Sequence, residues 1–263
     1  MANKKALLVV SFGTSYADTR KLTIEACEDK IRQEFKDHDF FRAWTSRKII
    51  KKLKEKENTI IKFPDEVMEE IYQAGYDEVL VQSLHIINGE EFDKIKDICR
   101  YCKDKFDKIV LGRPLLSSPK DYDEVTDIIE KMARENLGDN PEDGEVLVLM
   151  GHGTEHVAHA SYAGLEYRIK VKGLPVYVGT VEGYPDVDTV IDQLKKDGIH
   201  KVHLRPFLLV AGVHAKKDMA GDSEDSWKTK FTRAGFDVVI HLESLGQMEE
   251  VQDMFLRNLK EEI

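Results

Sequence analysis

The chain has 263 residues, 41% hydrophobic and 33% charged, so it can bury a full core as one large domain or two small ones. Its formal net charge of −10 argues against a general affinity for nucleic acid or for an anionic membrane surface. The early apolar run of residues 6–12 is too short to span a membrane, and no small-residue cleavage site follows it. We therefore expect a cytoplasmic protein that binds neither membrane nor nucleic acid.

Short apolar runs rich in β-branched residues alternate with longer amphipathic stretches along the chain. The predicted strands are residues 6–12, 39–45, 78–84, 108–114, 145–151, 175–181, 201–209 and 237–243. Between them apolar residues recur every three or four positions. In residues 63–75, for example, Pro64 and acidic residues mark the start of a helix and Gly75 marks its end. This alternation predicts an α/β fold in which helices cover both faces of parallel sheets.

Two of the three cysteines, Cys99 and Cys102, form a CxxC pair. A single pair of this kind is weak evidence for metal or redox chemistry. Both residues share a helical spacing with Ile95 and Phe106, which is typical of the buried face of a helix. We interpret them as core residues, because a free cysteine packs as a small hydrophobic side chain.

Two segments of the first half align without gaps on two segments of the second. The aligned pairs are residues 75–91 with 198–214 and residues 9–15 with 149–155. The second pair places Phe12 on His152. The first pair places Glu91 on His214. The chain therefore reads as a duplication in which the two copies carry different chemistry.

The predicted architecture has two similar halves related by a pseudo-twofold axis, each a four-stranded parallel sheet flanked by helices. The boundary is expected in residues 136–145, a loop rich in Gly, Asp, Asn and Pro. Residues 1–140 would form the half that grips the substrate. Residues 141–263 would form the half that carries the metal-binding and catalytic residues.

Three polar side chains stand where consecutive strands of the second half end: His152, Glu182 and His214. Ligands of open parallel sheets bind outside the carboxyl ends of the strands, which lie about 4.8 Å apart, so these side chains can converge. Two imidazoles and one carboxylate suit Zn²⁺, Fe²⁺ or Co²⁺ and leave coordination positions open. Neighbouring glycines are expected to leave room for a large flat ligand; they are Gly151, Gly153, Gly183 and Gly212.

Each of these residues also has a purely structural interpretation. A histidine after a strand is often a hydrogen-bonded loop residue, and Glu182 could cap the helix that starts near Pro185. His156 and His159 lie at helical spacing from His152 and could simply line a helix face. Only the occurrence of three such groups at equivalent positions of consecutive units favours a functional site.

The first half lacks these groups. Residues 11–16 offer hydroxyl and backbone N–H groups at an expected helix N-terminus, which favours carboxylates or phosphates. Together with residues at and after the third strand, the candidate substrate-binding residues are Ser11, Gly13, Thr14, Ser15, Tyr16, Ser83, Leu84, His85 and Glu90. The glycine-rich motifs of dinucleotide and P-loop proteins are missing, and so is the HExxH motif of zinc proteases.

The sequence resembles the anaerobic sirohydrochlorin cobaltochelatases, class II chelatases that are related in fold to ferrochelatase. The resemblance implies an active-site cleft between the two similar halves. The likeness covers nearly the whole chain and rests on the ordered motifs KKALLVVSFGTSYADT, VQSLHIINGEE, GRPLLSSPKDY, LMGHGTEH, VEGYPDVD and RPFLLVAGVHAKKDMAGD. It implies ATP-independent insertion of Co²⁺ into the tetrapyrrole sirohydrochlorin, early in the anaerobic route to cobalamin. It also implies that His152, Glu182 and His214 bind the metal and accept the pyrrole protons.

The resemblance implies no cofactor beyond the substrate metal Co²⁺, with Fe²⁺ or Ni²⁺ as alternative metals in vitro. His85 matches a histidine that some exported relatives use to bind haem, but this chain shows no export signal, so haem is not expected here. Two other functions stay open: a sirohydrochlorin ferrochelatase, because the ligand set does not separate Co²⁺ from Fe²⁺, and a non-catalytic tetrapyrrole or metal carrier. A homo-oligomer is compatible with the sequence.

Overall fold

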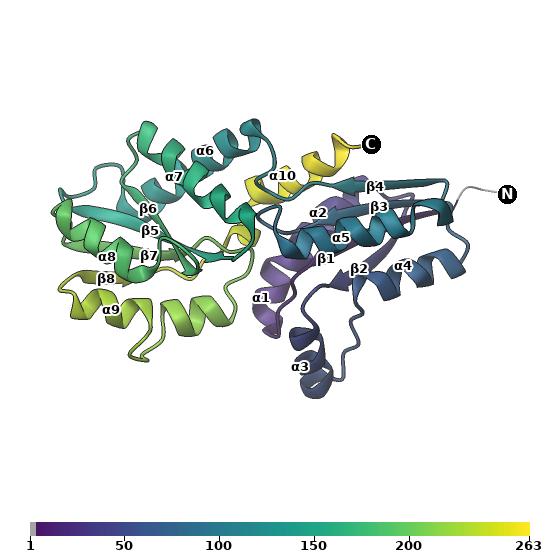
Figure 1. Ribbon diagram of the computed structural model, residues 1–263, viewed down its shortest axis with the longest axis horizontal. Coiled ribbons are helices and arrows are strands. Elements are labelled where there is room, and N and C mark those ends of the chain that lie inside the picture. Colours follow the sequence, from purple (N-terminus) through teal and green to yellow (C-terminus); the bar gives the residue numbers. More distant parts are fainter. Residues whose placement is uncertain (1–3) are drawn as a thin grey trace. The chain divides into compact units, whose positions relative to one another are not determined.

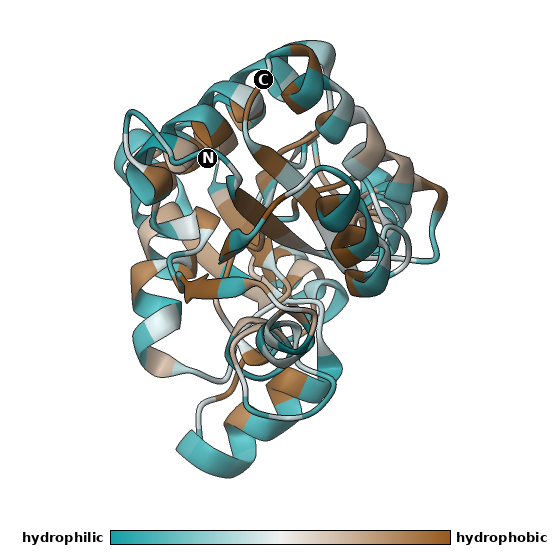
Figure 2. Ribbon diagram, turned by 90° about the vertical axis from the view of Figure 1, so that its left-hand side faces the viewer, coloured by the Kyte–Doolittle hydropathy of each residue, from teal (hydrophilic) through white to brown (hydrophobic). Residues whose placement is uncertain are grey.

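The structure is a computed structural model that describes residues 4–263. These residues form two compact units, each built around its own parallel sheet (Figure 1). The first unit runs to Ser117 and takes up the chain again at Gly246–Ile263, and the second is Ser118–Leu245. Hydrophobic residues are concentrated in the strands, and hydrophilic residues cover much of the helices (Figure 2). None of the helices within residues 4–263 has the length and apolar character needed to cross a bilayer.

The first unit contains a four-stranded sheet with the order β2-β1-β3-β4, and every pairing in it is parallel. Its strands are β1 (Lys5–Ser11), β2 (Asp39–Trp44), β3 (Glu78–Ser83) and β4 (Lys108–Gly112). Its helices are α1 (Ala17–Leu22), α2 (Ile24–Glu34), α3 (Arg47–Glu57), α4 (Pro64–Gln73), α5 (Glu90–Tyr101) and α10 (Glu249–Lys260). Helix α10 packs against α2, β3 and β4, and α5 packs against α4 and β4.

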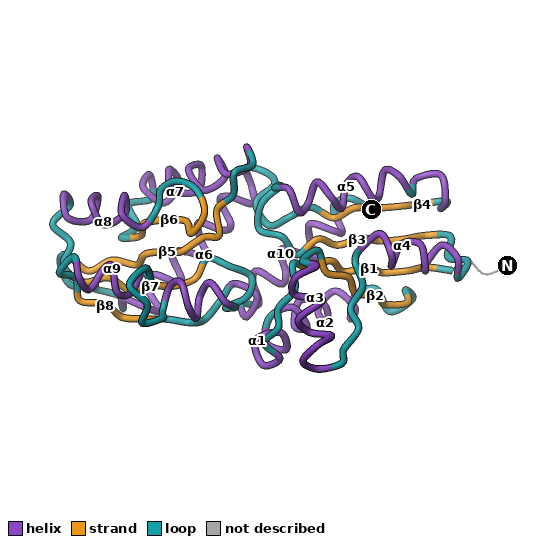
Figure 3. The backbone as a smooth tube through the Cα atoms, turned by 60° about the horizontal axis from the view of Figure 1, so that its bottom comes forward, coloured by secondary structure: helices purple, strands orange, loops and turns teal. Residues whose placement is uncertain are grey.

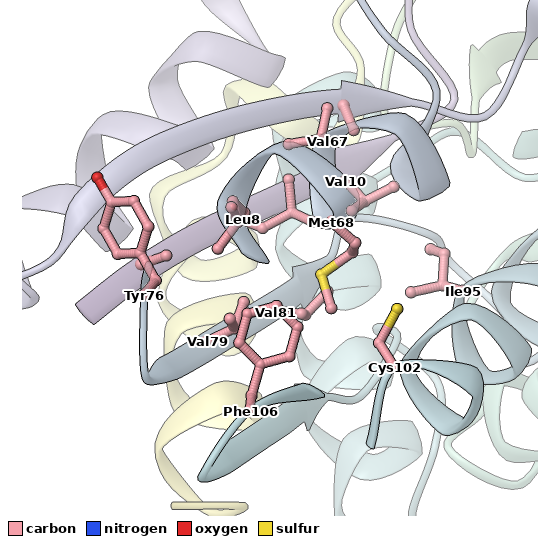
Figure 4. Packing of buried hydrophobic residues seen from close by; sticks show 13 residues of the cluster. Leu8, Val10, Val67, Met68, Tyr76, Val79, Val81, Ile95, Cys102 and Phe106 are labelled. Atoms are coloured by element: carbon pink, nitrogen blue, oxygen red, sulfur yellow. The ribbon is translucent and has the colours of Figure 1, made fainter. Parts of the chain in front are cut away.

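One hydrophobic cluster fills the space between this sheet and helices α4 and α5 (Figure 4). Alternate residues of β1 and β3 enter it, among them Leu8 and Val81, because successive side chains of a strand point to opposite faces. Cys102 is buried in this cluster, and the partly buried Cys99 packs against it. Both are free thiols, and the CxxC pair lies in the core as predicted.

The second unit repeats this arrangement with a parallel sheet of order β6-β5-β7-β8. Its strands are β5 (Glu145–Gly153), β6 (Val176–Glu182), β7 (Lys201–Pro206) and β8 (Asp237–Ile240). Its helices are α6 (Pro119–Leu137), α7 (Ala160–Val171), α8 (Val187–Lys196) and α9 (Trp227–Arg233), with the short 3₁₀ helix η2 (Val157–His159) and the π-helix η3 (His214–Met219). In Figure 3, α7 and α8 run beside β6, which they contact. The matching strand orders of the two sheets confirm the predicted duplication. The eight strands observed within the described residues confirm the eight predicted strands.

The compact units do not coincide with the predicted halves 1–140 and 141–263. Helix α6 follows β4 in the chain but packs on α7 and β5 of the second unit. Helix α10 follows β8 but packs in the first unit. Each copy therefore ends in a helix that completes the other unit. The predicted boundary segment, residues 136–145, lies inside the second unit and runs from the end of α6 to the start of β5. It does not separate the units, because α6 buries its apolar face in the second unit.

Candidate metal-binding and catalytic site

The order of the strands brings the three predicted site residues of the second unit to one edge of the sheet. Strand β5 lies between β6 and β7, and His152 is the residue before its end. Glu182 ends β6 and pairs through its Cα with Gly153. His214 begins η3, which follows the loop after β7. Parallel strands all point the same way, so their carboxyl ends place these residues together.

The side chains of these residues are close to one another. The imidazole rings of His152 and His214 meet edge to face, with their centroids 4.7 Å apart and their planes at 84°. Nδ1 of His152 lies 3.8 Å from Oε2 of Glu182. The side chains of His152 and Glu182 are 38% and 59% exposed, and that of His214 is 34% exposed. The structure thus joins the predicted trio in an accessible cluster within one unit.

The neighbours of the two imidazoles select the tautomer of each ring. Nδ1 of His214 lies 2.6 Å from Oδ2 of Asp218, and Nδ1 of His152 lies 3.1 Å from the carbonyl oxygen of Gly153. An ionised carboxylate and a carbonyl oxygen can only accept, so both rings donate from Nδ1. In a neutral imidazole the other nitrogen, Nε2, then carries the lone pair that can bind a metal or a proton.

Asp218 was missed by the sequence analysis. It lies four residues after His214 in η3, and the buried residues Ala215 and Met219 hold this π-helix against the core. A carboxylate that accepts from the second nitrogen of a metal-binding histidine orients the ring and favours the bound cation. The spacing in HAKKD was the available signal, since residues four apart on a helix face each other.

At Gly151, Gly153 and Gly183 the protein itself occupies the space beside the glycine, so the expected close approach of the backbone is found there but the expected room for a ligand is not. A Cβ on Gly151 would lie 2.5 Å from the ring of Tyr162, and one on Gly153 would lie 1.5 Å from the carbonyl oxygen of Glu182. A Cβ on Gly183 would lie 2.5 Å from the ring of His159. These glycines allow β5, β6 and the start of α7 to pack closely. Within residues 4–263, no three His, Cys, Asp or Glu side chains are arranged to hold a metal ion.

The other two histidines of this segment have local partners. Nδ1 of His156 accepts from the backbone N–H of Ala158 at 3.1 Å and so caps η2. His159 contacts the backbone of Thr154 and of Tyr184. The structural interpretation of His156 is therefore the one that its contacts favour.

The candidate residues of the first unit are only partly accessible. The side chains of Ser11, Ser83 and Leu84 are buried in this structure. The sequence placed them correctly at strand ends but did not reveal which way they point. The Cβ position of Gly13 is filled by the ring of Trp44.

The remaining candidates lie on loops and at helix starts. The buried hydroxyl of Thr14 accepts from the backbone N–H of Tyr16, and Ser15 and Tyr16 are half-buried. Glu90 is exposed and pairs with Lys94 at 3.1 Å. Helix α1 has no side-chain cap and only six residues, so the expected anion site at its N-terminus has little support.

His85 is held inside the first unit by hydroxyl groups. Its Nδ1 lies 2.9 Å from the hydroxyl oxygen of Ser83, and its Nε2 lies 3.4 Å from that of Thr45. Desolvation of the ring lowers the pKa of His85 to about 4, with a smaller opposing effect of Glu91. The imidazole is therefore neutral at physiological pH.

Solved structures with the same fold define the class of protein. SirB from Bacillus subtilis, solved with Fe³⁺, has a TM-score of 0.68 at 18% identity, over 98% of this chain and 95% of that one. CbiX, described as the terminal enzyme of sirohaem biosynthesis in denitrifying bacteria, has a TM-score of 0.61 at 15% identity, over 98% of this chain and 100% of that one. The chain has the duplicated α/β fold of the chelatases.

Sequence comparison identifies the family within the chelatases to which the chain belongs. Residues 5–263 match the family described as cobalt chelatase (CbiK). The sirohydrochlorin cobaltochelatase of Salmonella typhimurium is 42% identical over 256 residues, which are 97% of this chain and 95% of that protein. The sirohydrochlorin cobaltochelatase CbiKC of Nitratidesulfovibrio vulgaris is 30% identical over 261 residues, 97% of this chain and 89% of that protein. The chain belongs to the cobalt chelatase (CbiK) family.

Proposed function

We propose that this chain inserts Co²⁺ into sirohydrochlorin without ATP, as a step of the anaerobic route to cobalamin. The curated relatives carry this activity in their names and align over nearly the full chain. The observation that carries the assignment of residues is the pair of imidazoles, His152 and His214, 4.7 Å apart at the carboxyl edge of one sheet. An imidazole nitrogen binds a divalent metal at about 2.0–2.1 Å, so rings this close can both reach one ion.

The reaction exchanges one Co²⁺ for the two N–H protons at the centre of the ring, and charge is conserved. Before insertion, the Nε2 atoms of His152 and His214 replace water on the substrate metal. Glu182 supplies a third donor by turning its exposed side chain toward the same ion. Three protein ligands leave coordination positions open, which the pyrrole nitrogens can then enter.

His152 is the proposed acceptor of the first proton. Metal binding and protonation use the same lone pair on Nε2, so His152 can accept a proton only after it has released the metal to the ring. The imidazolium that results would be stabilised by the carboxylate of Glu182, 3.8 Å from Nδ1 in this structure. His214 keeps Asp218 as its partner throughout.

The first unit is proposed to grip the tetrapyrrole through the loop that follows β1. Phe12 stands there at the position equivalent to His152 and is 42% exposed, so it offers an apolar face to a flat ring. Ser15 and Tyr16 lie in the same loop and are also partly accessible. Membership in the cobalt chelatase family implies a tetrapyrrole and a divalent metal as the ligands.

The test is anaerobic insertion of Co²⁺, Fe²⁺ and Ni²⁺ into sirohydrochlorin in parallel, followed by the visible spectrum of the ring. Wild-type protein should be fastest with Co²⁺, and His152→Ala should be slow with every metal. His200→Ala is the matched control, because His200 is exposed in the same unit and contacts the backbone of Asp143. A wild-type rate equal to the uncatalysed rate would refute the enzyme and leave a carrier, and a clear preference for Fe²⁺ would refute the cobalt assignment.

A further inference from the structure

One imidazole bridges the two loops that follow His152 and Glu182 in the chain. Nδ1 of His159 accepts from the backbone N–H of Thr154 at 3.3 Å. Its Nε2 contacts both backbone groups of Tyr184: the N–H of Tyr184 is directed at Nε2 at 3.1 Å, and the carbonyl oxygen of Tyr184 lies within hydrogen-bond distance of the same nitrogen. Thr154 lies two residues after His152, and Tyr184 lies two residues after Glu182.

The packing around this ring is close on both sides. The Cβ position of Gly183 is filled by the His159 ring, and Gly183 has a φ of +113°, a backbone conformation that side chains disfavour. On its other side, His159 packs against Tyr162, with ring centroids 5.4 Å apart. The hydroxyl of the buried Tyr162 lies 3.4 Å from the backbone nitrogen of Gly153. The start of α7 thus fastens the end of β5 to the loop after β6.

The geometry points to His159 as a positioning residue that sets the place of Glu182 relative to His152. Glu182 is the most exposed of the three site residues, and its backbone is fixed on one side by pairing with Gly153 and on the other by the His159 contact with Tyr184. Without the imidazole, the loop after Glu182 loses its tie to β5. This inference rests on the proposed function, since it assigns His159 a task in the same metal site.

Two substitutions separate the hydrogen bonds of the ring from its volume. His159→Phe keeps a flat ring over Gly183 but removes both hydrogen bonds, and we expect kcat/KM for Co²⁺ to fall about tenfold, as for other partners of metal ligands. His159→Gln keeps polar atoms that can bond to the Tyr184 backbone and should restore most of the activity. Val157→Ala is the matched control from the same turn and should stay within about twofold of wild type, because Val157 is 85% exposed and surface changes of this kind have small effects.

A double-mutant cycle with Glu182→Ala tests whether His159 acts through Glu182. If it does, His159→Phe should add no further loss of Co²⁺ affinity or of kcat/KM in the Glu182→Ala background. Equal losses in both backgrounds would overturn the inference, as would a His159→Phe protein with wild-type Co²⁺ affinity. Amide exchange at Thr154 should speed up in His159→Phe, because its N–H loses an acceptor, and unchanged exchange would likewise overturn it.

Failure of the proposed function would be visible in the wild-type and Glu182→Ala proteins of the same double-mutant cycle. If wild-type protein does not insert Co²⁺, or if Glu182→Ala binds and inserts Co²⁺ as wild type does, the role of Glu182 is refuted without any His159 variant. If Glu182→Ala is impaired and His159→Phe is not, only the positioning role is refuted.

Discussion

The two units of this protein share a strand order and differ at the carboxyl edge of each sheet. In the first unit β1 ends at Ser11 and Phe12 follows, whereas β5 continues through His152 to Gly153. After β3 the chain enters the regular helix α5, whereas after β7 it enters the short π-helix η3. Such π segments often occur at functional sites. The two copies thus share one scaffold and differ in a few residues at strand ends, and under the proposed function these residues decide which copy binds the metal.

The largest effect on activity is expected from a substitution that gives the second copy the residue found in the first. His152→Phe removes the proposed metal ligand and proton acceptor, so kcat/KM for Co²⁺ insertion should fall by about 10²–10⁴-fold, the usual range for loss of general acid–base catalysis. Steady-state anaerobic assays would measure it, with circular dichroism as the check on folding. A folded variant with more than half of the wild-type activity would contradict the assigned role.

A smaller effect is expected from the partner of the second histidine. Asp218→Asn replaces a pure acceptor by an amide that can also donate, so the ring of His214 loses its fixed tautomer. The affinity for Co²⁺, measured by titration without tetrapyrrole, should fall about 10–100-fold. Nitrogen-15 NMR of His214 should show loss of the Nδ1–H form. The control is Asp222→Asn, an exposed carboxylate that pairs with Lys228, and an equal loss in both variants would refute a specific role for Asp218.

Sequence patterns were sufficient to predict the strands and the convergence of His152, Glu182 and His214, for a physical reason. Parallel strands align their carboxyl ends, so the residues after consecutive strands converge wherever the chain alternates strand and helix. The direction in which each side chain points, and its hydrogen-bond partners, could not be predicted in this way. Ser11 and Ser83 lie at strand ends but are buried, and the four-residue spacing of His214 and Asp218 did not by itself show that a π-helix forms there.

The exchange of terminal helices also escaped prediction. Both α6 and α10 are amphipathic and follow the last strand of their own copy, so the pattern alone assigns them to it. Which sheet they cover depends on where their apolar faces find a partner. The division of the chain thus required tertiary contacts that are distant in sequence.

His85 of the first unit extends the comparison to the dependence of folding stability on pH. The pKa of His85 is lowered to about 4 by desolvation, from an unfolded value near 6.5. Between these values the unfolded chain binds a proton that the folded chain does not, so stability falls as the pH drops from 6.5 toward 4. The loss should be on the order of 2 kcal/mol, and urea unfolding at pH 7.5 and 5 would measure it.

His85→Gln should reduce this pH dependence, because the group that binds the extra proton is absent. Its stability at pH 7.5 will also change through lost hydrogen bonds, so the quantity to compare is the difference between the two pH values. The expectation would be refuted by a variant that loses as much stability as wild type between pH 7.5 and 5.

The smallest effect on Co²⁺ insertion is expected from substitutions in the CxxC pair of the first unit, a residue pattern that binds metals in other proteins. Cys102 is buried among apolar residues, and desolvation raises the pKa of both Cys99 and Cys102, so neither thiol is readily ionised to bind a metal. Cys99→Ala should leave Co²⁺ affinity and kcat/KM within about twofold of wild type, as a substitution outside the site does. Cys102→Ala should lower the unfolding free energy by about 1 kcal/mol through a small cavity, again without a change in Co²⁺ affinity. A clear loss of Co²⁺ binding in either variant would mean that the first copy also handles the metal, and the contrast between the two sheet edges would then no longer hold.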